Sequence, residues 1–222
     1  MKIYGHRGAS GLAPENTIEA FKLALGMRVD GLEFDVRATA DGYPVLIHDR
    51  SLERTAGVDR NVDELTLVKL QGLAPQVPTF AALLELVGNT AHLDIEVKQS
   101  GIEERILETL SGFPDVRWAI SCFDWSVLER FRELSAGADL WLLADEPDDA
   151  LYKSAKLLGA SGVALGATAI TAAVIERAHE AGLIVMAWSV NDVAVAGWFQ
   201  GWGLDALCTD HPERWFGTAS VE

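Results

Sequence analysis

Apolar and polar residues alternate in the segment 31–37, which reads Gly-Leu-Glu-Phe-Asp-Val-Arg. Successive side chains of a β-strand point to opposite faces, so Glu33, Asp35 and Arg37 share one face and three apolar side chains share the other. Two carboxylates therefore lie side by side. An edge strand with its polar face in water is one interpretation. A buried strand would need a cation beside the acids, because burying unpaired carboxylates is costly.

The same alternation returns in the segment 93–98, Leu-Asp-Ile-Glu-Val-Lys, where Asp94, Glu96 and Lys98 share a face. Two such strands would bring several carboxylates and one ammonium group together. Carboxylate oxygens without cysteine or clustered histidine are hard ligands, which suit Mg²⁺ or Ca²⁺, with Mn²⁺ as a further candidate, better than zinc. The recurrence therefore favours a divalent metal site over a strand face in water.

Short β-like runs alternate with helix-like runs along the whole chain. Strands are predicted near Ile3 and at 32–36, 93–97, 117–121, 140–143, 163–165, 183–188 and 206–208. Helices are predicted at 16–27, 80–87, 102–110, 125–134, 148–158, 171–181 and 192–200, with a short one at 212–216. This order predicts an α/β protein with a (β/α)₈ TIM barrel, and an open doubly wound sheet is the alternative. Both architectures place functional side chains at the carboxyl ends of the strands.

A hairpin is predicted directly after the second strand. The dipeptide Asp-Gly at 41–42 is a strong signal for a two-residue turn, and an apolar run returns after it. Counting outward from such a turn pairs Ala38 with Val45 and Asp35 with His48. This register places His48 beside the acidic strand, whereas a slip of one residue would leave it on the surface.

The whole chain, residues 1–222, is expected to form a single domain. It is long enough for one well-buried core, 49% of its residues are hydrophobic, and no linker interrupts it. The hairpin return strand and a short insertion cover 43–78, with a helical candidate at 62–70, and form either a lid or an ordinary packed loop. Only 217–222 is expected to fray.

Charge and composition exclude several classes of partner. The formal net charge of −15 argues against nucleic acid or an anionic membrane, because both require a basic surface. No apolar run reaches the roughly 18 to 20 residues that span a bilayer, and no signal peptide precedes the first strand, so no membrane anchor is expected. Cys122 and Cys208 lie far apart, which favours buried thiols in a reduced, cytoplasmic compartment over a disulfide scaffold.

Several further residues have both a functional and a structural interpretation. His6 and Arg7 lie between two glycines after the first strand, a site-like arrangement, although such a pair is more often on the surface. Trp188 ends the seventh strand and Phe123 follows the fourth, where each could line a pocket or pack in the core.

Other polar residues have a sufficient structural explanation. Asn16, three residues before a glutamate, has the spacing of a helix N-cap and capping box, and Asn191 could cap the following helix. The remaining histidines, His92, His179 and His211, are interpreted as structural.

Taken together, these segments resemble the glycerophosphodiester phosphodiesterase family. The shared motifs occur in the same order and spacing over essentially the whole chain: His-Arg-Gly at 6–8, Pro-Glu-Asn-Thr at 14–17, Glu-x-Asp at 33–35, His-Asp at 48–49, Ile-Glu-Val-Lys at 95–98, Ala-Trp-Ser-Val-Asn at 187–191 and Thr-Asp-His-Pro at 209–212. The resemblance implies a TIM barrel that hydrolyses glycerophosphodiesters to glycerol 3-phosphate and an alcohol. It implies a divalent metal on Glu33, Asp35 and Glu96. The region after His48 is shorter than is common in the family, which bears on substrate preference.

The catalytic chemistry expected from this resemblance uses two histidines. His6 would be the general base and His48 the general acid, and the reverse stays open because both imidazoles titrate near neutrality. Arg7 and Lys98 would hold phosphate oxygens, the first as a fork and the second as a point charge. Two alternatives remain: a related phospholipase-D-like barrel that releases a cyclic phosphate, and a non-catalytic barrel that binds phosphate or lipid. The second is disfavoured by the presence of both histidines and all three carboxylates.

Overall fold

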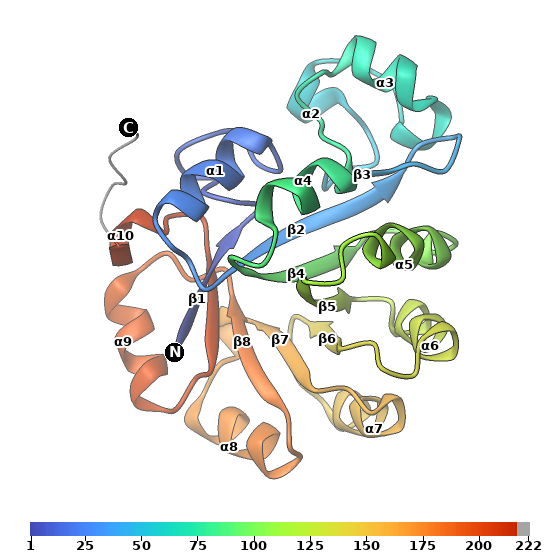
Figure 1. Ribbon diagram of the computed structural model, residues 1–222. Helices are drawn as coiled ribbons and strands as arrows, with labels where there is room; N and C mark the ends of the chain where they lie inside the picture. The colour runs from blue at the N-terminus through green and yellow to red at the C-terminus, as the bar shows by residue number, and fades with distance from the viewer. Residues whose placement is uncertain (217–222) are drawn as a thin grey trace.

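The computed structural model describes residues 1–216, so the segment 217–222, which was expected to fray, lies outside the described residues. In the described part, eight parallel strands surround a central axis (Figure 1). They are β1 (Lys2–His6), β2 (Gly31–Ala38), β4 (His92–Val97), β5 (Arg117–Cys122), β6 (Leu140–Ala144), β7 (Gly162–Gly166), β8 (Ile184–Trp188) and β9 (Ala206–Thr209). Because β1 pairs with both β9 and β2, the sheet is closed. The predicted TIM barrel is confirmed and the open sheet is wrong.

An outer ring of helices covers the barrel (Figure 1). The longer helices are α1 (Ile18–Gly26), α4 (Phe80–Val87), α5 (Glu103–Ser111), α6 (Trp125–Leu134), α7 (Asp149–Leu158), α8 (Ala172–Glu180) and α9 (Val193–Gly201), and the short α10 (Glu213–Phe216) follows β9. Each begins close to its predicted start, and α6 to α9 begin at Asp or Thr caps that accept backbone N–H groups. Nothing among the described helices is long and apolar enough to span a bilayer.

The barrel interior is filled by side chains that point inward from the strands. Its apolar layer consists of Tyr4, Ala119, Trp141, Leu143, Ala164, Met186, Ala206 and Cys208. His92 stacks on Trp141 and shares a hydrogen bond of 3.1 Å with the Tyr4 hydroxyl, as a structural residue would. Cys122 and Cys208 are both buried free thiols.

The hairpin after β2 has a different register from the predicted one. In the antiparallel pair of β2 with β3 (Pro44–Leu46), Ala38 faces Pro44, one residue earlier than predicted. Asp35 consequently lies opposite Ile47, whose N–H donates to the Asp35 carbonyl at 3.0 Å. The predicted pairing of Asp35 with His48 is therefore wrong.

The slip arises because the turn contains three residues and not two. Thr39 and Tyr43 close the loop, with a backbone hydrogen bond of 3.1 Å, and the Thr39 hydroxyl accepts the Tyr43 N–H at 3.0 Å and donates to Asp41 at 2.7 Å. Gly42 has a φ of +81° and donates to the Thr39 carbonyl at 2.9 Å. A turn followed by a glycine with positive φ is the usual three-residue hairpin loop.

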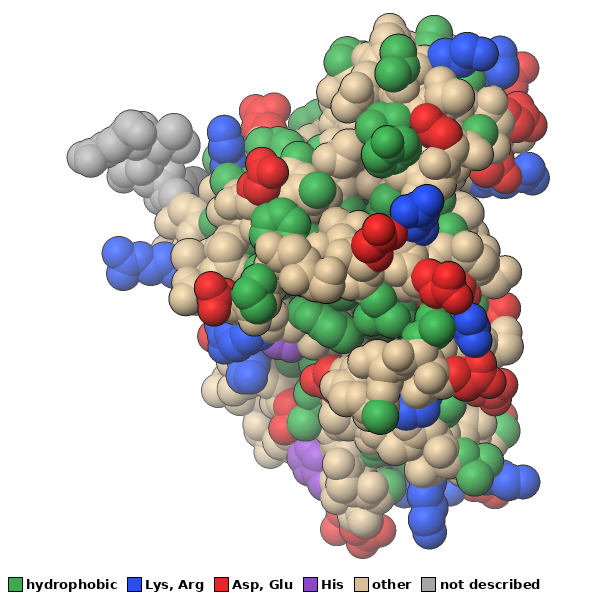
Figure 2. All heavy atoms as spheres, turned by 45° about the vertical axis from the view of Figure 1, so that its right-hand side comes forward, with side chains coloured by type: hydrophobic (Ala, Val, Ile, Leu, Met, Phe, Trp, Pro, Cys, Tyr) green, Lys and Arg blue, Asp and Glu red, His purple; other side chains and the backbone are tan. Residues whose placement is uncertain are grey.

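The insertion forms a small protrusion beside the barrel, at the upper right of Figure 1 and the top of Figure 2. It contains α2 (Glu53–Ala56), the 3₁₀-helix η1 (Val62–Glu64) and α3 (Leu67–Leu73). The predicted helix at 62–70 is therefore divided, because Leu65 and Thr66 adopt extended backbone conformations between η1 and α3. A separate apolar cluster holds the insertion together: Val45, Ile47, Leu52, Val62, Leu65, Leu70, Ala74 and Val77.

Candidate active site

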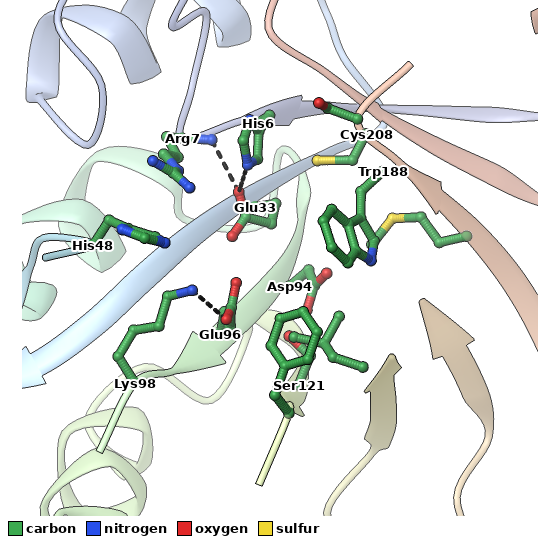
Figure 3. Close-up of a pocket in the computed structure, with 14 residues that line it drawn as sticks. His6, Arg7, Glu33, His48, Asp94, Glu96, Lys98, Ser121, Trp188 and Cys208 are labelled. Atoms are coloured by element: carbon green, nitrogen blue, oxygen red, sulfur yellow. Dashed lines mark hydrogen bonds and ion pairs between the residues drawn. The ribbon is translucent and has the colours of Figure 1, made fainter. Parts of the chain in front are cut away.

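A cavity of about 290 Å³ opens at the carboxyl ends of the barrel strands (Figure 3). Eight of the nine predicted site residues line it, namely His6, Arg7, Glu33, His48, Glu96, Lys98, Phe123 and Trp188. The ninth, Asp35, is fully buried among them and contacts both Arg7 and Lys98. The barrel thus brings together residues that lie up to 182 positions apart in the sequence, from His6 to Trp188.

Three carboxylates from two neighbouring strands form the acidic centre of the cavity. In the parallel pair of β2 and β4, Asp35 is in register with Glu96, and Glu33 lies two residues before Asp35 on the same face. One oxygen of each of these three side chains lies within 4.8 Å of the others. Glu33 Oε1 is buried without a hydrogen-bond partner, and Asp35 Oδ1 is buried with the Lys98 ammonium group 3.1 Å away. An all-oxygen donor set that includes an unpartnered oxygen fits a hard divalent cation.

Two basic side chains neutralise part of this charge. Lys98 Nζ lies 3.1 Å from Asp35 Oδ1 and donates to Glu96, while Arg7 Nε lies 3.1 Å from Asp35 Oδ2. Burial alone would raise the pKa of Asp35, but Lys98 and Arg7 hold that pKa below its ordinary value. Burial and the charge of Asp35 raise the pKa values of Glu33 and Glu96 to about 7. Asp35 is thus the most firmly ionised of the three.

The raised pKa values predict how the metal-free protein responds to pH. Glu33 and Glu96 bind protons more tightly in the folded protein than in the unfolded chain. Their contribution to stability is therefore present below their ordinary pKa of 4.5 and is lost as the pH rises to their folded-state pKa of about 7. We expect Glu33→Gln and Glu96→Gln to raise the melting temperature of the chelated protein at pH 7.5 while weakening metal binding. Asp35→Asn is the contrasting variant and should lower the melting temperature, because it removes the partner of Lys98 and Arg7.

Thermal unfolding in excess chelator at pH 5 and pH 7.5 checks this expectation, with metal affinity measured in parallel by calorimetry. A lower melting temperature for both Gln variants at pH 7.5 would contradict the repulsion between these carboxylates.

The turn after β1 places Arg7 over the acidic centre. Arg7 has a φ of +54° and its N–H donates to Glu33 Oε2 at 3.0 Å. Its guanidinium donates to Glu15 at 2.8 Å. Gly8 follows with a φ of +83° and packs against α1, where an added Cβ would lie 2.7 Å from the Ala20 carbonyl carbon. The His-Arg-Gly motif therefore needs glycine for both backbone conformation and space.

The predicted N-cap role of Asn16 is wrong. Thr17 caps α1 by accepting the Ala20 N–H at 3.2 Å, and Asn16, with a φ of +56°, turns toward the site. Asn16 Nδ2 donates to Asp35 Oδ2 at 2.7 Å, and Asn16 Oδ1 accepts the Asp35 N–H at 3.3 Å. Threonine one position later is also a favoured N-cap residue, and this was the available sequence signal. Asn16 thus fixes the orientation of the Asp35 carboxylate.

His6 is held by a network of polar side chains that the sequence did not reveal. Its Nδ1 lies 2.6 Å from Asp210, which also accepts from Ser10 at 2.9 Å and Asn191 at 2.6 Å. A carboxylate can only accept, so the imidazole proton lies on Nδ1 and Nε2 points to Glu33 at 3.8 Å. Burial acts to lower the pKa of His6, but the Asp210 hydrogen bond and the Glu33 charge outweigh it and raise that pKa.

Asn191 belongs to this network and does not cap α9 as predicted. Asp192 is the cap, since it accepts the N–H groups of Ala194 and Val195. Asn191 Oδ1 accepts the Asp210 N–H at 2.9 Å, so Asn191 orients Asp210 from both sides. The only sequence signal for Asp210 was its position in the Thr-Asp-His-Pro motif after the last strand.

His48 lies on the other side of the cavity in a similar arrangement (Figure 3). Its Nδ1 lies 2.6 Å from Asp49, which leaves Nε2 for the cavity, and its carbonyl accepts from Arg37 Nε at 2.7 Å. Burial lowers the pKa of His48, and the nearby charge of Asp35 opposes this only in part. His48 reaches the site despite the different register because regular pairing ends at Leu46.

Two aromatic rings form the apolar side of the cavity. Phe123 and Trp188 meet edge to face, with ring centroids 5.5 Å apart. Phe123 is 45% exposed, so its interpretation as a core residue is wrong. Trp188 both lines the cavity and packs on the barrel interior.

Comparison with known proteins shows the family to which the chain belongs. Residues 6–214 match the model of the glycerophosphoryl diester phosphodiesterase family. The protein YhdW of Bacillus subtilis is 33% identical over 233 residues, and a glycerophosphodiester phosphodiesterase of Bacillus altitudinis is 30% identical over 238 residues, each alignment covering 96% of both chains. A phosphodiesterase of Oleispira antarctica, solved in complex with the product sn-glycerol-3-phosphate, superposes with a TM-score of 0.89 at 26% identity, covering 96% of this chain and 94% of that chain. The chain therefore belongs to the glycerophosphoryl diester phosphodiesterase family.

Proposed function

We propose that this protein is a metal-dependent phosphodiesterase that hydrolyses glycerophosphodiesters to glycerol 3-phosphate and an alcohol. The observation that carries the proposal is the convergence of three carboxylates, two basic side chains and two carboxylate-held imidazoles on one cavity. Hydrolysis of a phosphodiester needs its charge neutralised, a nucleophilic oxygen deprotonated and a leaving alkoxide protonated. These residues supply each of those functions. Family membership supports the same substrate class.

Glu33, Asp35 and Glu96 would hold the metal ion, with Mg²⁺ or Ca²⁺ preferred and Mn²⁺ compatible with the same ligands. A bound divalent ion polarises the phosphoryl oxygens and favours deprotonation of an oxygen nucleophile. Lys98 now contacts two of the same carboxylates, so a bound cation would compete with its ammonium group and leave it to the phosphate. Arg7 would bind a second phosphate oxygen through its guanidinium.

Lys98→Ala is expected to lower kcat/KM by roughly 10- to 100-fold, comparable with the loss of one hydrogen bond to a charged group. If the contact strengthens in the transition state the loss falls on kcat, and otherwise on KM. Steady-state kinetics at saturating metal separates the two. Lys156→Ala, on α7 away from the cavity, is the control and should behave as wild type. Unchanged kcat and KM in Lys98→Ala would remove Lys98 from the site.

His6 and His48 are proposed as the acid–base pair. In the metal-free protein His6 has the raised pKa and His48 the lowered one, so His6 is the histidine that holds a proton more firmly. A cation held by Glu33 would lower the pKa of His6, because it cancels a negative charge that stabilises the imidazolium. The roles implied by the family resemblance, His6 as base and His48 as acid, therefore belong to the metal-loaded protein.

A turnover screen tests the proposed function. Glycerophosphocholine, glycerophosphoethanolamine and glycerophosphoglycerol are incubated with Mg²⁺, Ca²⁺ or Mn²⁺, and products are identified by ³¹P NMR. We expect glycerol 3-phosphate from at least one of them. Accumulation of a cyclic phosphate as the end product would indicate internal phosphoryl transfer, and binding without turnover would indicate a binding protein.

A further inference from the structure

The insertion beside the barrel sends one charged side chain back toward the active site. Arg54 lies in α2, and its guanidinium donates hydrogen bonds from all three of its nitrogens. Nε donates to Asp49 Oδ2 at 2.5 Å. The two terminal nitrogens donate to the two oxygens of Glu15, at 2.6 Å and 2.8 Å. Arg54 thus joins two carboxylates, one 5 and one 39 residues before it in the sequence.

Each of these carboxylates holds a side chain that lines the cavity. Asp49 Oδ1 lies 2.6 Å from His48 Nδ1, and Glu15 Oε1 accepts from the Arg7 guanidinium at 2.8 Å. Figure 3 shows His48 and Arg7 in the same half of the cavity. Arg54 is therefore one hydrogen-bonded step behind both the histidine proposed for acid–base catalysis and the arginine proposed to bind phosphate.

The backbone around Arg54 is held by the packing of the insertion. Leu52, two residues earlier, is fully buried in the apolar cluster of the insertion, and Ala56, two residues later, packs against that cluster. The Leu52 N–H donates to the Arg60 carbonyl at 2.9 Å, and Gly57 ends α2 with a φ of +67°. The guanidinium therefore extends from a backbone that is anchored on both sides.

Arg54 also keeps both carboxylates ionised. Its hydrogen bonds are the largest cause that lowers the pKa of Glu15 and of Asp49 below their ordinary values. An ionised carboxylate accepts hydrogen bonds and donates none, so Asp49 places the His48 ring proton on Nδ1 and leaves Nε2 for the cavity. In the same way, both oxygens of Glu15 stay available to the guanidinium groups of Arg7 and Arg54.

We propose that Arg54 is a positioning residue for the phosphodiesterase reaction. Through Asp49 it fixes the orientation and tautomer of the His48 imidazole. Through Glu15 it fixes the Arg7 guanidinium. Groups that hold catalytic side chains from behind in this way set their geometry without touching the substrate. This inference rests on the proposed function, and it assigns the insertion a role as a support behind the site.

Activity and stability should respond very differently to the loss of Arg54. Its side chain is 49% exposed, and ion pairs in such places stabilise folded proteins only weakly. We therefore expect Arg54→Ala to lower the melting temperature by no more than about 4 °C. In excess Mg²⁺, kcat/KM for a glycerophosphodiester should fall roughly 10- to 100-fold, since a displacement of about 1 Å at a catalytic group can cost about 10²-fold.

Two further variants make the test specific. Arg50→Ala is the matched control, because Arg50 belongs to the same insertion and pairs with Asp63 in the protrusion at 2.9 Å. It should behave as wild type. Arg54→Lys keeps the positive charge, but one ammonium group cannot replace the fork on Glu15 together with the bond to Asp49, so it should recover only part of the activity. Full activity in Arg54→Lys would show that charge alone is needed and would overturn the inference.

Side-chain NMR tests the positioning without requiring turnover. At about pH 8.5, where the His48 imidazole is neutral, its ¹⁵N signals report which ring nitrogen carries the proton. We expect Nδ1–H in wild type and a mixture of Nδ1–H and Nε2–H in Arg54→Ala. The Arg7 Nε–H should exchange with water roughly 3- to 10-fold faster in Arg54→Ala, because Glu15 then loses its hydrogen bonds to Arg54. Both signals should be unchanged in Arg50→Ala.

The inference assigns Arg54 to both side chains, so an unchanged His48 tautomer or an unchanged Arg7 exchange rate in Arg54→Ala would overturn it, whatever the activity of wild type. Unchanged kcat and KM in Arg54→Ala would overturn it as well, because the reaction would then not need this positioning. Both spectroscopic changes in a protein that hydrolyses no glycerophosphodiester would leave the positioning by Arg54 standing and the proposed function wrong.

Discussion

Exhaustive chelation is expected to abolish hydrolysis of glycerophosphodiesters, and added Mg²⁺, Mn²⁺ or Ca²⁺ should restore it. The loss should be at least about 10³-fold, because a metal ion supplies several kcal/mol of charge stabilisation in the transition state. Without a metal, the buried carboxylates Glu33, Asp35 and Glu96 present net negative charge to an anionic substrate. Lys98 is then occupied by Asp35 and Glu96 and is not available to the phosphate.

The measurement is turnover of a glycerophosphodiester before and after removal of the chelated metal, with the fold followed by circular dichroism. Glu96→Gln is the matched variant, and it should need a higher concentration of Ca²⁺ or Mg²⁺ for half-maximal activity. Full activity in the metal-free protein would contradict the metal site, whichever residues bind the substrate.

The barrel and most residues of the candidate site could be predicted from the sequence, because both depend on the alternation of apolar and polar residues within short segments. Glu33 and Asp35 share a strand face at i and i+2, and so do Glu96 and Lys98. In a parallel sheet, adjacent strands then bring these faces together without any further information, and the structure has Asp35 in register with Glu96. The eight strands themselves followed from apolar runs separated by helix-like segments.

The incorrect predictions concern two helix caps and the hairpin register. Asn16 and Asn191 each had a local capping explanation, but a neighbouring Thr17 or Asp192 took that position and released the amide for a distant partner. Partners such as Asp35 and Asp210 lie 19 residues away in each case, and the parallel pairing of consecutive barrel strands, β1 with β2 and β8 with β9, brings them near. The hairpin register depended on whether the loop held two or three residues, and in the structure the Thr39 hydroxyl accepts the Tyr43 N–H across the three-residue loop.

Loss of either His6 or His48 is expected to lower catalytic activity strongly. His6→Ala and His48→Ala should each lower kcat/KM by roughly 10²- to 10⁴-fold, the usual range for one general acid or base. Wild type should show a bell-shaped dependence of kcat/KM on pH, because one imidazole must be neutral and the other protonated. The two limbs belong to the pair as a whole. His179→Ala, a surface histidine bonded to Asp205 outside the cavity, is the control and should leave both limbs in place.

The leaving group separates the two roles. A diester with p-nitrophenol as the leaving alcohol needs little protonation when its bond to phosphorus breaks, so loss of the general acid should matter far less for it than for an alkyl diester. If His48 is the acid, His48→Ala should be rescued substantially with the p-nitrophenyl substrate, while His6→Ala stays impaired on both. Rescue of His6→Ala would reverse the roles and agree with the pKa order of the metal-free protein. Equal impairment of both variants on both substrates would exclude a division into acid and base, since neither histidine would then act on the leaving oxygen.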